Sequence, residues 1–305
     1  MKILKIIILQ LVLIIGLIPS ISFCDGTRLT PSGNVVYMEV YTDHPFIREN
    51  IGDKNGTLQK NDIILSIKYN MKETHNLNEI YNLMKIPNKK LCVTLLRKYT
   101  KIEKTITSDI LRKYVLSDRI TGGWTVTAID EFGKYIGMAH GLYICDNKDY
   151  SNINNSKIYE TLYVQDVKST KDKIGYLEIT PSDRIIGSID SVSEYGTKGK
   201  YYNFKYDDNK ALEISKPKIG KAYIYCESPI TNKIDYHEIE ILDVMSSRSS
   251  IKIKDESLIN ARGGGVQGMS GSPVIQDNKI VGALSYINNN DKTTGFMTNI
   301  NYMLK

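Results

Sequence analysis

The feature of this sequence that most constrains its fold is the rhythm of the chain after about residue 104. From there to residue 305, short apolar runs alternate with glycine and Asn/Asp turns, and long stretches with helical periodicity are scarce. The clearest of these runs cover residues 125–129, 222–226, 238–242 and 251–254. Short strands at regular spacing are typical of a β-barrel or a β-sandwich. We therefore expect residues 104–305 to form a mainly β domain.

The preceding segment, residues 34–103, has a different pattern and predicts a small α/β domain. A strand at 35–41 is followed, after a loop, by a polar turn that leads into a short apolar strand. Apolar residues then recur at helical spacing, with Asn76 or Asn78 as the candidate N-cap, and a last strand covers 91–96. The helical positions are Leu77, Ile80, Tyr81 and Met84.

The first 24 residues have the outline of a secretory signal or a membrane anchor. Lys2 and Lys5 supply positive charge, and residues 6–23 contain no charged side chain. This run is also long enough to span a bilayer, so cleavage of the segment and its retention as an anchor both stay open. Cys24 occupies the place of a lipoprotein cysteine, but the bulky Phe23 before it argues against lipidation. In either case we expect the rest of the chain across a membrane from the cytoplasm.

Charge and cysteine usage argue against two classes of function. The net charge is +6, but lysines and acids are interspersed without a basic stripe, so we expect a solvated surface and no nucleic-acid partner. The four cysteines include no C-x-x-C pair, so a zinc site is not expected. Cys145 and Cys226 either form a disulfide outside the cytoplasm or are separate buried thiols.

One stretch suggests catalysis, because residues 263–274 read GGGVQGMSGSPV and contain five glycines and two serines. A serine hydroxyl attacks a carbonyl efficiently when a base takes its proton and preorganised donors hold the oxyanion that forms. Glycines let the backbone turn sharply, so the amides of Gly268 and Ser270 can point into one oxyanion hole. From the residues alone, Ser270 and Ser272 are both candidate nucleophiles. The competing interpretation is a flexible hinge with turn serines.

A general base for such a serine would be one of four histidines. His44 and His75 belong to the α/β segment, and His237 follows polar residues and is expected at the surface. His140 is the best candidate, because it lies in a glycine-bracketed turn after a strand and precedes the serine stretch. The residues alone do not select the acid of a triad. Its candidates are Asp146, Asp166, Asp183, Asp190 and Asp255.

The run from Gly268 to Pro273 is similar to the G-x-S-G-x-P loop of chymotrypsin-like peptidases. The following residues resemble the two paired strands after that loop, with a turn at Asp277 and Asn278 between them. The resemblance implies that Ser270 is the nucleophile. It also implies that Gly264, six residues earlier, lies at the base of the specificity pocket, which gives no support for a preference for basic residues. Ser285 would lie in the strand that pairs with the substrate backbone.

The α/β segment resembles a PDZ domain. Residues 59–64, QKNDII, are similar to the "GDII" turn of those domains, with Asn61 in place of the usual glycine. PDZ domains bind extended peptides by strand addition, so the resemblance implies a peptide ligand. The competing interpretation is a small packing domain without a ligand.

Three segments together closely resemble one family: residues 133–141 (GKYIGMAHG), 253–258 (IKDESL) and 263–273 (GGGVQGMSGSP). These are the stage IV sporulation protein B peptidases, serine peptidases of endospore formers. The family has an N-terminal membrane segment, a PDZ domain and a chymotrypsin-like double β-barrel. The same division is implied here, at residues 1–24, 34–103 and 104–305.

The resemblance also implies the residues of the site. Ser270 would be the nucleophile, His140 the general base and Asp255, fifteen residues before the serine, the acid of the triad. No metal or cofactor is implied. Ala139 stands where the family usually has a glycine before the histidine.

By the same resemblance, the chain would be a serine endopeptidase made in the forespore and exported to the space between the two membranes. There it would cleave a membrane-associated regulator in sporulation signalling, and it would also cleave itself. The PDZ-like segment would recruit the substrate or restrain the peptidase. The alternative from another functional class is a catalytically silent PDZ scaffold that keeps a peptidase-like barrel.

Overall fold

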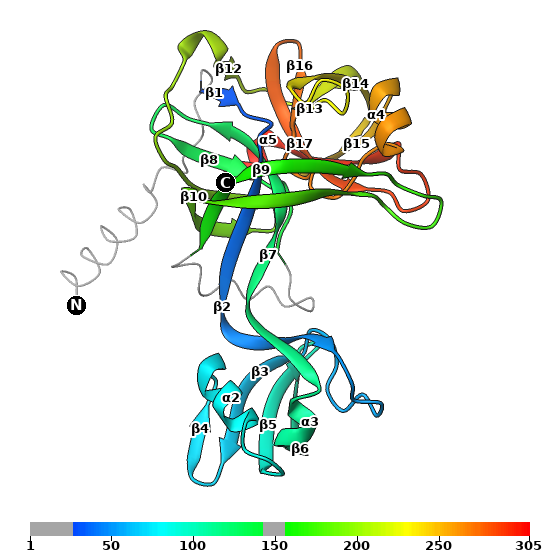
Figure 1. Ribbon diagram of the computed structural model, residues 1–305. Coiled ribbons are helices and arrows are strands. Elements are labelled where there is room, and N and C mark those ends of the chain that lie inside the picture. The colour runs from blue at the N-terminus through cyan, green and yellow to red at the C-terminus, as the bar shows by residue number, and fades with distance from the viewer. Residues whose placement is uncertain (1–26, 143–155) are drawn as a thin grey trace, which may run out of the picture.

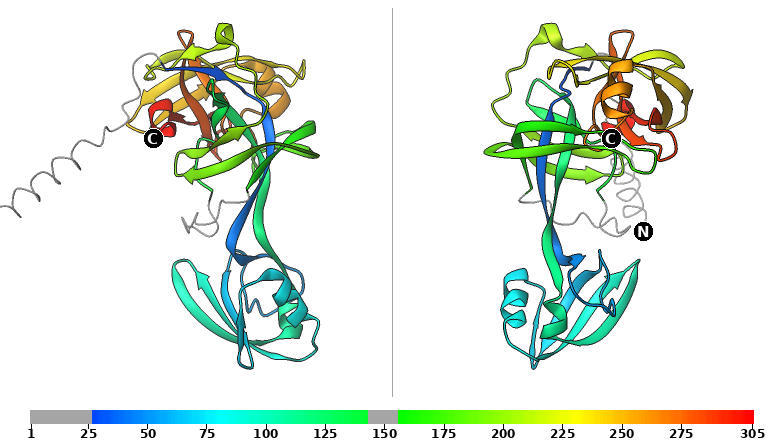
Figure 2. Two further views of the ribbon diagram at one scale, coloured as in Figure 1. Left: turned by 90° about the vertical axis from the view of Figure 1, so that its left-hand side faces the viewer. Right: turned by 45° about the vertical axis from the view of Figure 1, so that its right-hand side comes forward.

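Two antiparallel strands, β2 (Val35–Asn50) and β7 (Tyr114–Ile129), connect the two parts of the molecule. In the computed structural model, which describes residues 27–142 and 156–305, they run from an upper body down to a smaller lower lobe (Figure 1). Their pairing begins with Val35 opposite Thr125 and ends with Asn50 opposite Tyr114. Both views of Figure 2 show the lobe attached to the body along these strands. The fold is mainly β, as predicted.

The upper body contains a first barrel, a ring of six strands that β2 and β7 close by pairing with each other. From β7 the ring continues through β8 (Lys134–Gly137), β11 (Gly196–Tyr201), β10 (Tyr176–Ser193) and β9 (Lys157–Val167), which pairs with β2. Large side chains such as Trp124, Tyr135 and Ile158 fill its core. Two short strands, β1 (Arg28–Pro31) and β12 (Leu212–Glu213), extend the sheet beyond β7, and a 3-10 turn, η1 (Asp208–Lys210), precedes β12.

A second six-stranded barrel follows in the chain. Its strands are β13 (Gly220–Glu227), β14 (Ile234–Val244), β15 (Arg248–Ile253), β18 (Thr294–Asn299), β17 (Lys279–Ile287) and β16 (Pro273–Gln276), in this order around the ring. The predicted turn between β16 and β17 is confirmed, since Asp277 and Asn278 both take positive φ values, as tight hairpin turns require. Two short helices, α4 (Glu256–Arg262) and α5 (Ile300–Met303), lie outside the ring. The sequence therefore folds into two barrels, as expected.

Alternation along β13 turns Ala222, Ile224 and Cys226 inward to the core of the second barrel. Cys226 is a buried free thiol, and its burial raises its pKa to about 12. The predicted alternative, a disulfide with Cys145, involves a residue outside the described ranges.

A separate apolar cluster joins the two barrels, with residues from both of them and from α5. Its members include Leu29, Ala128, Ile136, Ala283, Ile300 and Met303.

The lower lobe consists of β3 (Ile63–Tyr69), β4 (Lys72–Thr74), α2 (Leu77–Met84), β5 (Lys90–Arg97), β6 (Thr100–Thr107) and α3 (Ser108–Leu111). The predicted helix is confirmed, and the Asn76 side chain caps it by accepting hydrogen bonds from the Asn78 and Glu79 amides. Asn61 has a φ of 72°, so it takes the left-handed conformation that a glycine would take in its place. The lobe has its own core, which includes Ile64, Ile80 and Leu95.

The lobe is inserted into the first barrel rather than placed before it. We expected the small domain to begin at residue 34, but residues 35–41 of β2 pair with residues 119–125 of β7 in the upper body. The predicted boundary at residue 34 therefore does not coincide with the start of the lobe. The lower ends of β2 and β7 extend into it, where Ile47 pairs with Leu116. Its assignment as a PDZ domain stays a prediction.

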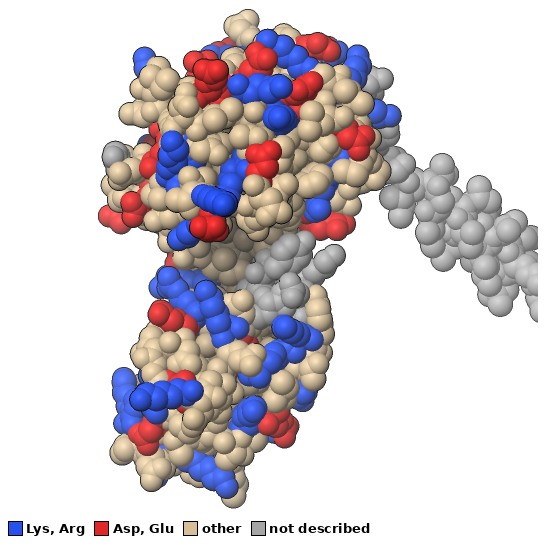
Figure 3. Space-filling model, turned by 90° about the vertical axis from the view of Figure 1, so that its right-hand side faces the viewer, with Lys and Arg blue, Asp and Glu red and all other residues tan. Residues whose placement is uncertain are grey.

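The N-terminal segment predicted to be a signal or an anchor, residues 1–24, lies outside the described residues. Among the residues that are described, no helix is long and apolar enough to cross a membrane. On the face shown in Figure 3, basic and acidic side chains intermingle over the upper body, which agrees with the solvated surface expected from the sequence.

Candidate active site

His140 lies in a turn after β8, at the junction of the two barrels. The two residues before it, Met138 and Ala139, have left-handed φ values of 65° and 60°, which cost energy for residues that carry a side chain. Two side chains of the second barrel hold this turn, because Ser285 Oγ and Thr298 Oγ1 donate to the Ala139 carbonyl at 2.8 and 2.6 Å. β17 and β18 therefore fix the position of the histidine.

The surroundings of His140 prepare it to act as a base. Its Nδ1 is 2.9 Å from the carbonyl oxygen of Gly141, so Nδ1 carries the proton and Nε2 is left as the basic nitrogen. The ring stacks on Tyr286 with centroids 5.1 Å apart, and the Arg248 guanidinium lies 5.0 Å from the centre of the same tyrosine ring. Burial lowers the pKa of His140; the Gly141 carbonyl opposes this shift, and the positive charge of Arg248 adds to it.

The loop that carries Ser270 is bound to β7 of the first barrel. The Thr125 amide donates to the Ser270 carbonyl at 2.8 Å, and the Thr125 hydroxyl donates to the Gly268 carbonyl at 2.9 Å. The Thr127 hydroxyl donates to the Gly271 carbonyl at 2.6 Å. The same stretch of β7 accepts a hydrogen bond from the Met138 amide through the Thr125 carbonyl. One strand thus positions both the serine loop and the histidine turn.

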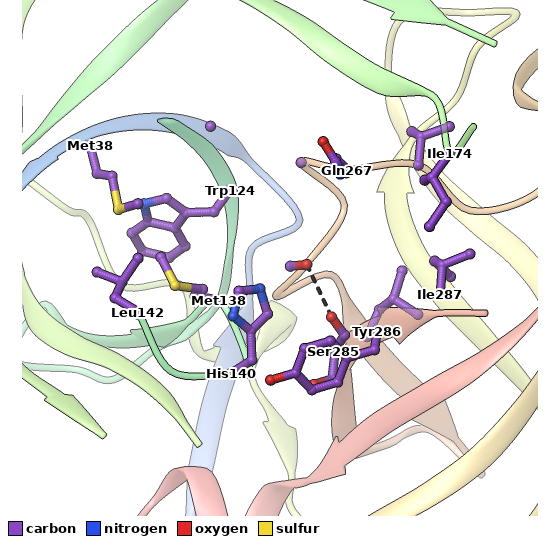
Figure 4. A pocket seen from close by; sticks show the side chains of 15 residues that line it. Met38, Trp124, Met138, His140, Leu142, Ile174, Gln267, Ser285, Tyr286 and Ile287 are labelled. Atoms are coloured by element: carbon purple, nitrogen blue, oxygen red, sulfur yellow. Dashed lines mark hydrogen bonds between the residues drawn. The ribbon is translucent and has the colours of Figure 1, made fainter. Parts of the chain in front are cut away.

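The structure distinguishes the two candidate serines. Ser270 is half-buried and lines a cavity. Its hydroxyl donates to the Ser285 carbonyl at 3.1 Å, the hydrogen bond drawn as a dashed line beside Ser285 in Figure 4. Ser272 is fully buried, and its hydroxyl donates to the Met269 carbonyl at 2.7 Å. Only Ser270 is placed to meet a substrate.

Two backbone amides beside Ser270 are available as donors. Within the described part of the chain, the amides of Gly268 and Ser270 donate no hydrogen bond. The neighbouring amides are all used, since those of Met269, Gly271 and Ser272 donate to backbone carbonyls. Gly268 has a φ of 101°, a conformation that favours glycine. Unpaired, preorganised amides next to a nucleophile are what an oxyanion hole requires.

His140, Ser270, Gly268 and Ser285 line one cavity of about 370 Å³ between the barrels. Figure 4 shows His140 and Ser285 at this cavity. The loop between β9 and β10 forms part of its wall through Ile174, and the Gln267 amide holds this loop by donating to the Gly175 carbonyl at 2.9 Å. The remaining lining is largely apolar. It includes Trp124, Met138, Leu142, Ile174, Val266 and Ile287.

Gly264, predicted at the base of the specificity pocket, is not among the residues that line this cavity. Its backbone, with a φ of 113°, packs against the Lys292 carbonyl oxygen, which would lie 2.3 Å from an added Cβ. The space beside Gly264 that a side chain would fill is therefore occupied by the backbone of the loop before β18. The apolar side chains of Val266 and Ile287 line the cavity in its place.

Asp255, predicted as the acid of the triad, is not brought to His140. Its carboxylate accepts hydrogen bonds from Ser257 Oγ and from the Leu258 amide, and it lies 3.3 Å from Nδ1 of His237. The expectation that His237 lies at the surface is wrong, because the residue is only 3% exposed. It shares the inward face of β14 with Ile239 and Ile241, two and four positions further on.

The sequence did not point to Arg248, to the Gly141 carbonyl or to the two β7 threonines. Tyr286 had a signal, as the aromatic residue after Ser285 in the strand that resembles a substrate-pairing strand. An arginine stacked on that ring has no local signature, because β15 and β17 are far apart in the chain. A backbone carbonyl has no signature in any sequence.

We predict that Gly271→Ala strongly destabilises the upper body. The φ of Gly271 is 99°, and an added Cβ would lie 1.9 Å from the Thr125 carbonyl oxygen. The change should lower the free energy of unfolding by at least about 2 kcal/mol. Gly220→Ala is the matched control, since Gly220 also has a positive φ, 123°, but no atom of the described residues lies within 4 Å of its added Cβ. It should cost about 1 kcal/mol. Urea denaturation measures both; equal costs would contradict the close contact with β7.

Comparisons with known proteins identify a family for this chain. Residues 113–304 match the model of one family, described as SpoIVB peptidase S55. No curated protein matches the chain. Among solved structures, the active form of the Rv3671c protease from M. tuberculosis has 13% identity and a TM-score of 0.37, over 60% of this chain and 70% of that one. The human pathogenic astrovirus serine protease has 11% identity and a TM-score of 0.34, over 58% and 83% of the two chains. TM-scores this low carry no argument, and the family match carries the assignment.

Proposed function

The chain belongs to the SpoIVB peptidase S55 family and is a serine peptidase, and on this premise we propose that it is an endopeptidase with Ser270 as the nucleophile and His140 as the general base. The observation that carries the proposal is the arrangement of one cavity. Ser270, His140 and the unpaired amide of Gly268 lie around it, on loops held by the same strand, β7. A protein substrate follows from the family.

The first step is the attack of Ser270 on a peptide carbonyl. Its hydroxyl leaves the Ser285 carbonyl, which becomes free to accept a hydrogen bond from the substrate backbone. The proton moves to Nε2 of His140, because Nδ1 is already held by the Gly141 carbonyl. A bond forms between Ser270 Oγ and the carbonyl carbon. The electron pair of the C=O bond moves to oxygen, where the amides of Gly268 and Ser270 stabilise the charge.

The tetrahedral intermediate then collapses to an acyl-enzyme. The C–N bond breaks, and His140 gives its proton to the leaving amine. Water then attacks the acyl carbon while His140 removes its proton. The ester bond to Ser270 breaks, His140 returns the proton to Ser270 Oγ, and the acid product is released. The largely apolar lining of the cavity, including Ile174, Val266 and Ile287, favours an apolar side chain before the cleaved bond.

Covalent labelling tests this proposal directly. A fluorophosphonate probe should modify the folded protein once, and peptide mass mapping should place the phosphonyl group on Ser270. Modification of Ser272 or of another serine would contradict the assignment. So would a folded protein that does not react at all.

The family name and the N-terminal apolar segment support a finer proposal. We propose that the chain acts in sporulation, is exported from the forespore, and cleaves a membrane-associated regulator and itself in the space between the two membranes. The lower lobe would bind an extended peptide, as PDZ domains do, and so recruit the substrate or restrain the peptidase. The order of strand, helix and strand in β3, α2 and β5 supports this part of the proposal.

The activity should depend on pH through His140. A general base acts when it is unprotonated, and the pKa of His140 is lowered from an ordinary value of about 6.5. We therefore expect kcat/KM to rise with pH through an apparent pKa below about 6.5 and to stay level above it. Arg248→Gln should move this rise to higher pH, because loss of the positive charge favours the imidazolium form.

Lys254→Gln is the matched control for Arg248→Gln. It removes one positive charge just beyond the opposite end of β15, where Lys254 pairs with Glu240 at 3.3 Å and the aromatic stack is absent. Its pH profile should match that of the wild type. An unchanged profile in Arg248→Gln would contradict the tuning of His140 by this arginine.

A further inference from the structure

The carboxylate of Asp255 is fully engaged at the start of α4. Oδ1 accepts from the Leu258 amide at 3.0 Å and from the Ser257 hydroxyl, so Asp255 is the N-cap of the helix. Oδ2 lies 3.3 Å from Nδ1 of His237, which is buried on β14. Burial opposes the charge of Asp255, but the hydrogen bonds outweigh it and hold the pKa of the carboxyl below its usual value.

His140 has a different partner. The Gly141 carbonyl oxygen occupies Nδ1, the nitrogen to which a triad acid would bind. Within the described part of the chain, no carboxylate forms a hydrogen bond or an ion pair with His140, and Asp255 does not line the cavity. A backbone carbonyl fixes the tautomer of an imidazole as a carboxylate does, but it brings no negative charge.

α4 links Asp255 to the nucleophile loop. The turn before the helix is bound to β14, because the amides of Lys254 and Asp255 both donate to the Glu238 carbonyl. Leu258 packs into the core of the second barrel. At the other end, Arg262 is buried and its Nε donates to Asp166 of β9 at 2.7 Å. The chain then turns at residue 263, five residues before the oxyanion glycine.

We propose that Asp255 is a positioning residue rather than the acid of a triad. By capping α4 and holding His237, it fixes the helix from which the loop with Gly268 and Ser270 departs, while the Gly141 carbonyl holds His140. The inference rests on the proposed roles of Ser270 and His140. It also explains how Asp255, fifteen residues before Ser270, can support catalysis without contacting that serine.

Replacing Asp255 by asparagine distinguishes a positioning residue from the acid of a triad. Asparagine caps helices about as well as aspartate, so Asp255→Asn keeps the hydrogen bond from the Leu258 amide. A triad acid cannot be replaced in this way, since the amide favours the wrong imidazole tautomer and the loss is about 10⁴-fold. Asp255→Ala removes the cap in either case. Asp235→Asn is the matched control, because Asp235 is an exposed carboxylate on β14, two residues before His237.

The experiment measures the rate constant for fluorophosphonate labelling and the pH dependence of kcat/KM on the full chain, well below the unfolding temperature. Asp255→Asn and Asp235→Asn should both label within about threefold of the wild type, with unchanged pH profiles. Asp255→Ala should label about 10 to 100 times more slowly per folded molecule, because the nucleophile loop is misplaced. Amide hydrogen exchange should show Leu258 less protected in Asp255→Ala and protected in Asp255→Asn.

Two results would overturn the inference. One is a loss of about 10³-fold or more in folded Asp255→Asn, with its Leu258 amide still protected, which would make Asp255 the triad acid. The other is labelling at the wild-type rate in Asp255→Ala, which would show that the cap does not position the loop. A wild type that does not label would refute the proposed function instead, and the exchange data on Leu258 would still decide whether Asp255 caps α4.

Discussion

Replacing Ser270 by alanine should lower kcat/KM for a peptide substrate by on the order of 10⁶-fold, the loss expected when a covalent nucleophile is removed. Fluorophosphonate labelling should disappear, and so should any self-cleavage of the chain. The fold should be retained, because within the described residues the Ser270 hydroxyl makes a single hydrogen bond, to the Ser285 carbonyl at the cavity. The Thr125 amide that holds the loop donates to the Ser270 backbone carbonyl, which alanine keeps.

Ser272→Ala is the control, two residues away in the same loop. Its hydroxyl is buried and donates to the Met269 carbonyl, so its loss should cost about 1 kcal/mol of stability. Activity and labelling of the folded protein should stay within a few-fold of the wild type. Labelling that persists in Ser270→Ala, or that disappears in folded Ser272→Ala, would contradict the choice between the two serines.

The elements that the sequence predicted are those whose signal is local. The helix over Leu77–Met84 follows from apolar spacing and an asparagine cap, and the turn at Asp277 and Asn278 follows from residues that tolerate positive φ. The serine loop is local in the same sense, because Gly268 and Gly271 both need positive φ values. Physical demands of this kind act within a few residues and can be read directly.

The features that the sequence did not predict depend on which distant elements meet. β2 is one uninterrupted strand of 16 residues that serves both the barrel and the lobe, so the boundary between them has no local mark. Arg248, Tyr286 and His140 come from β15, from β17 and from the turn after β8. Closure of the second barrel and its packing against the first bring them together. Asp255 has a suitable place in the chain, but its side chain faces His237.

The same lesson applies to Gly264 and His237. Six residues before a nucleophile is a position counted along the chain, but in the fold the backbone of Gly264 packs against that of Lys292, and Val266 and Ile287 line the cavity instead. The polar residues before His237 indicated a surface position, but strand alternation places the side chain on the inner face with Ile239. Alternation was the stronger signal in that segment.

Replacing His140 by glutamine should have nearly as large an effect as removing the serine. Without the imidazole, no group among the described residues that line the cavity can take the proton from Ser270, and kcat/KM should fall on the order of 10⁵- to 10⁶-fold. The residual rate should lose the rise with pH that His140 causes in the wild type. The double variant with Ser270→Ala should be no slower than either single variant, because the two residues act as one unit.

His75→Gln is the matched control for this change. His75 is an exposed residue of the lower lobe, and its ring contacts His44 rather than the cavity. Its kcat/KM and pH profile should equal those of the wild type. If His140→Gln kept more than about one per cent of wild-type kcat/KM, or kept the same pH profile, another group would have to be the base. If the losses from His140 and Ser270 instead added in the double variant, the two side chains would act in separate steps, and the direct proton transfer between them would be wrong.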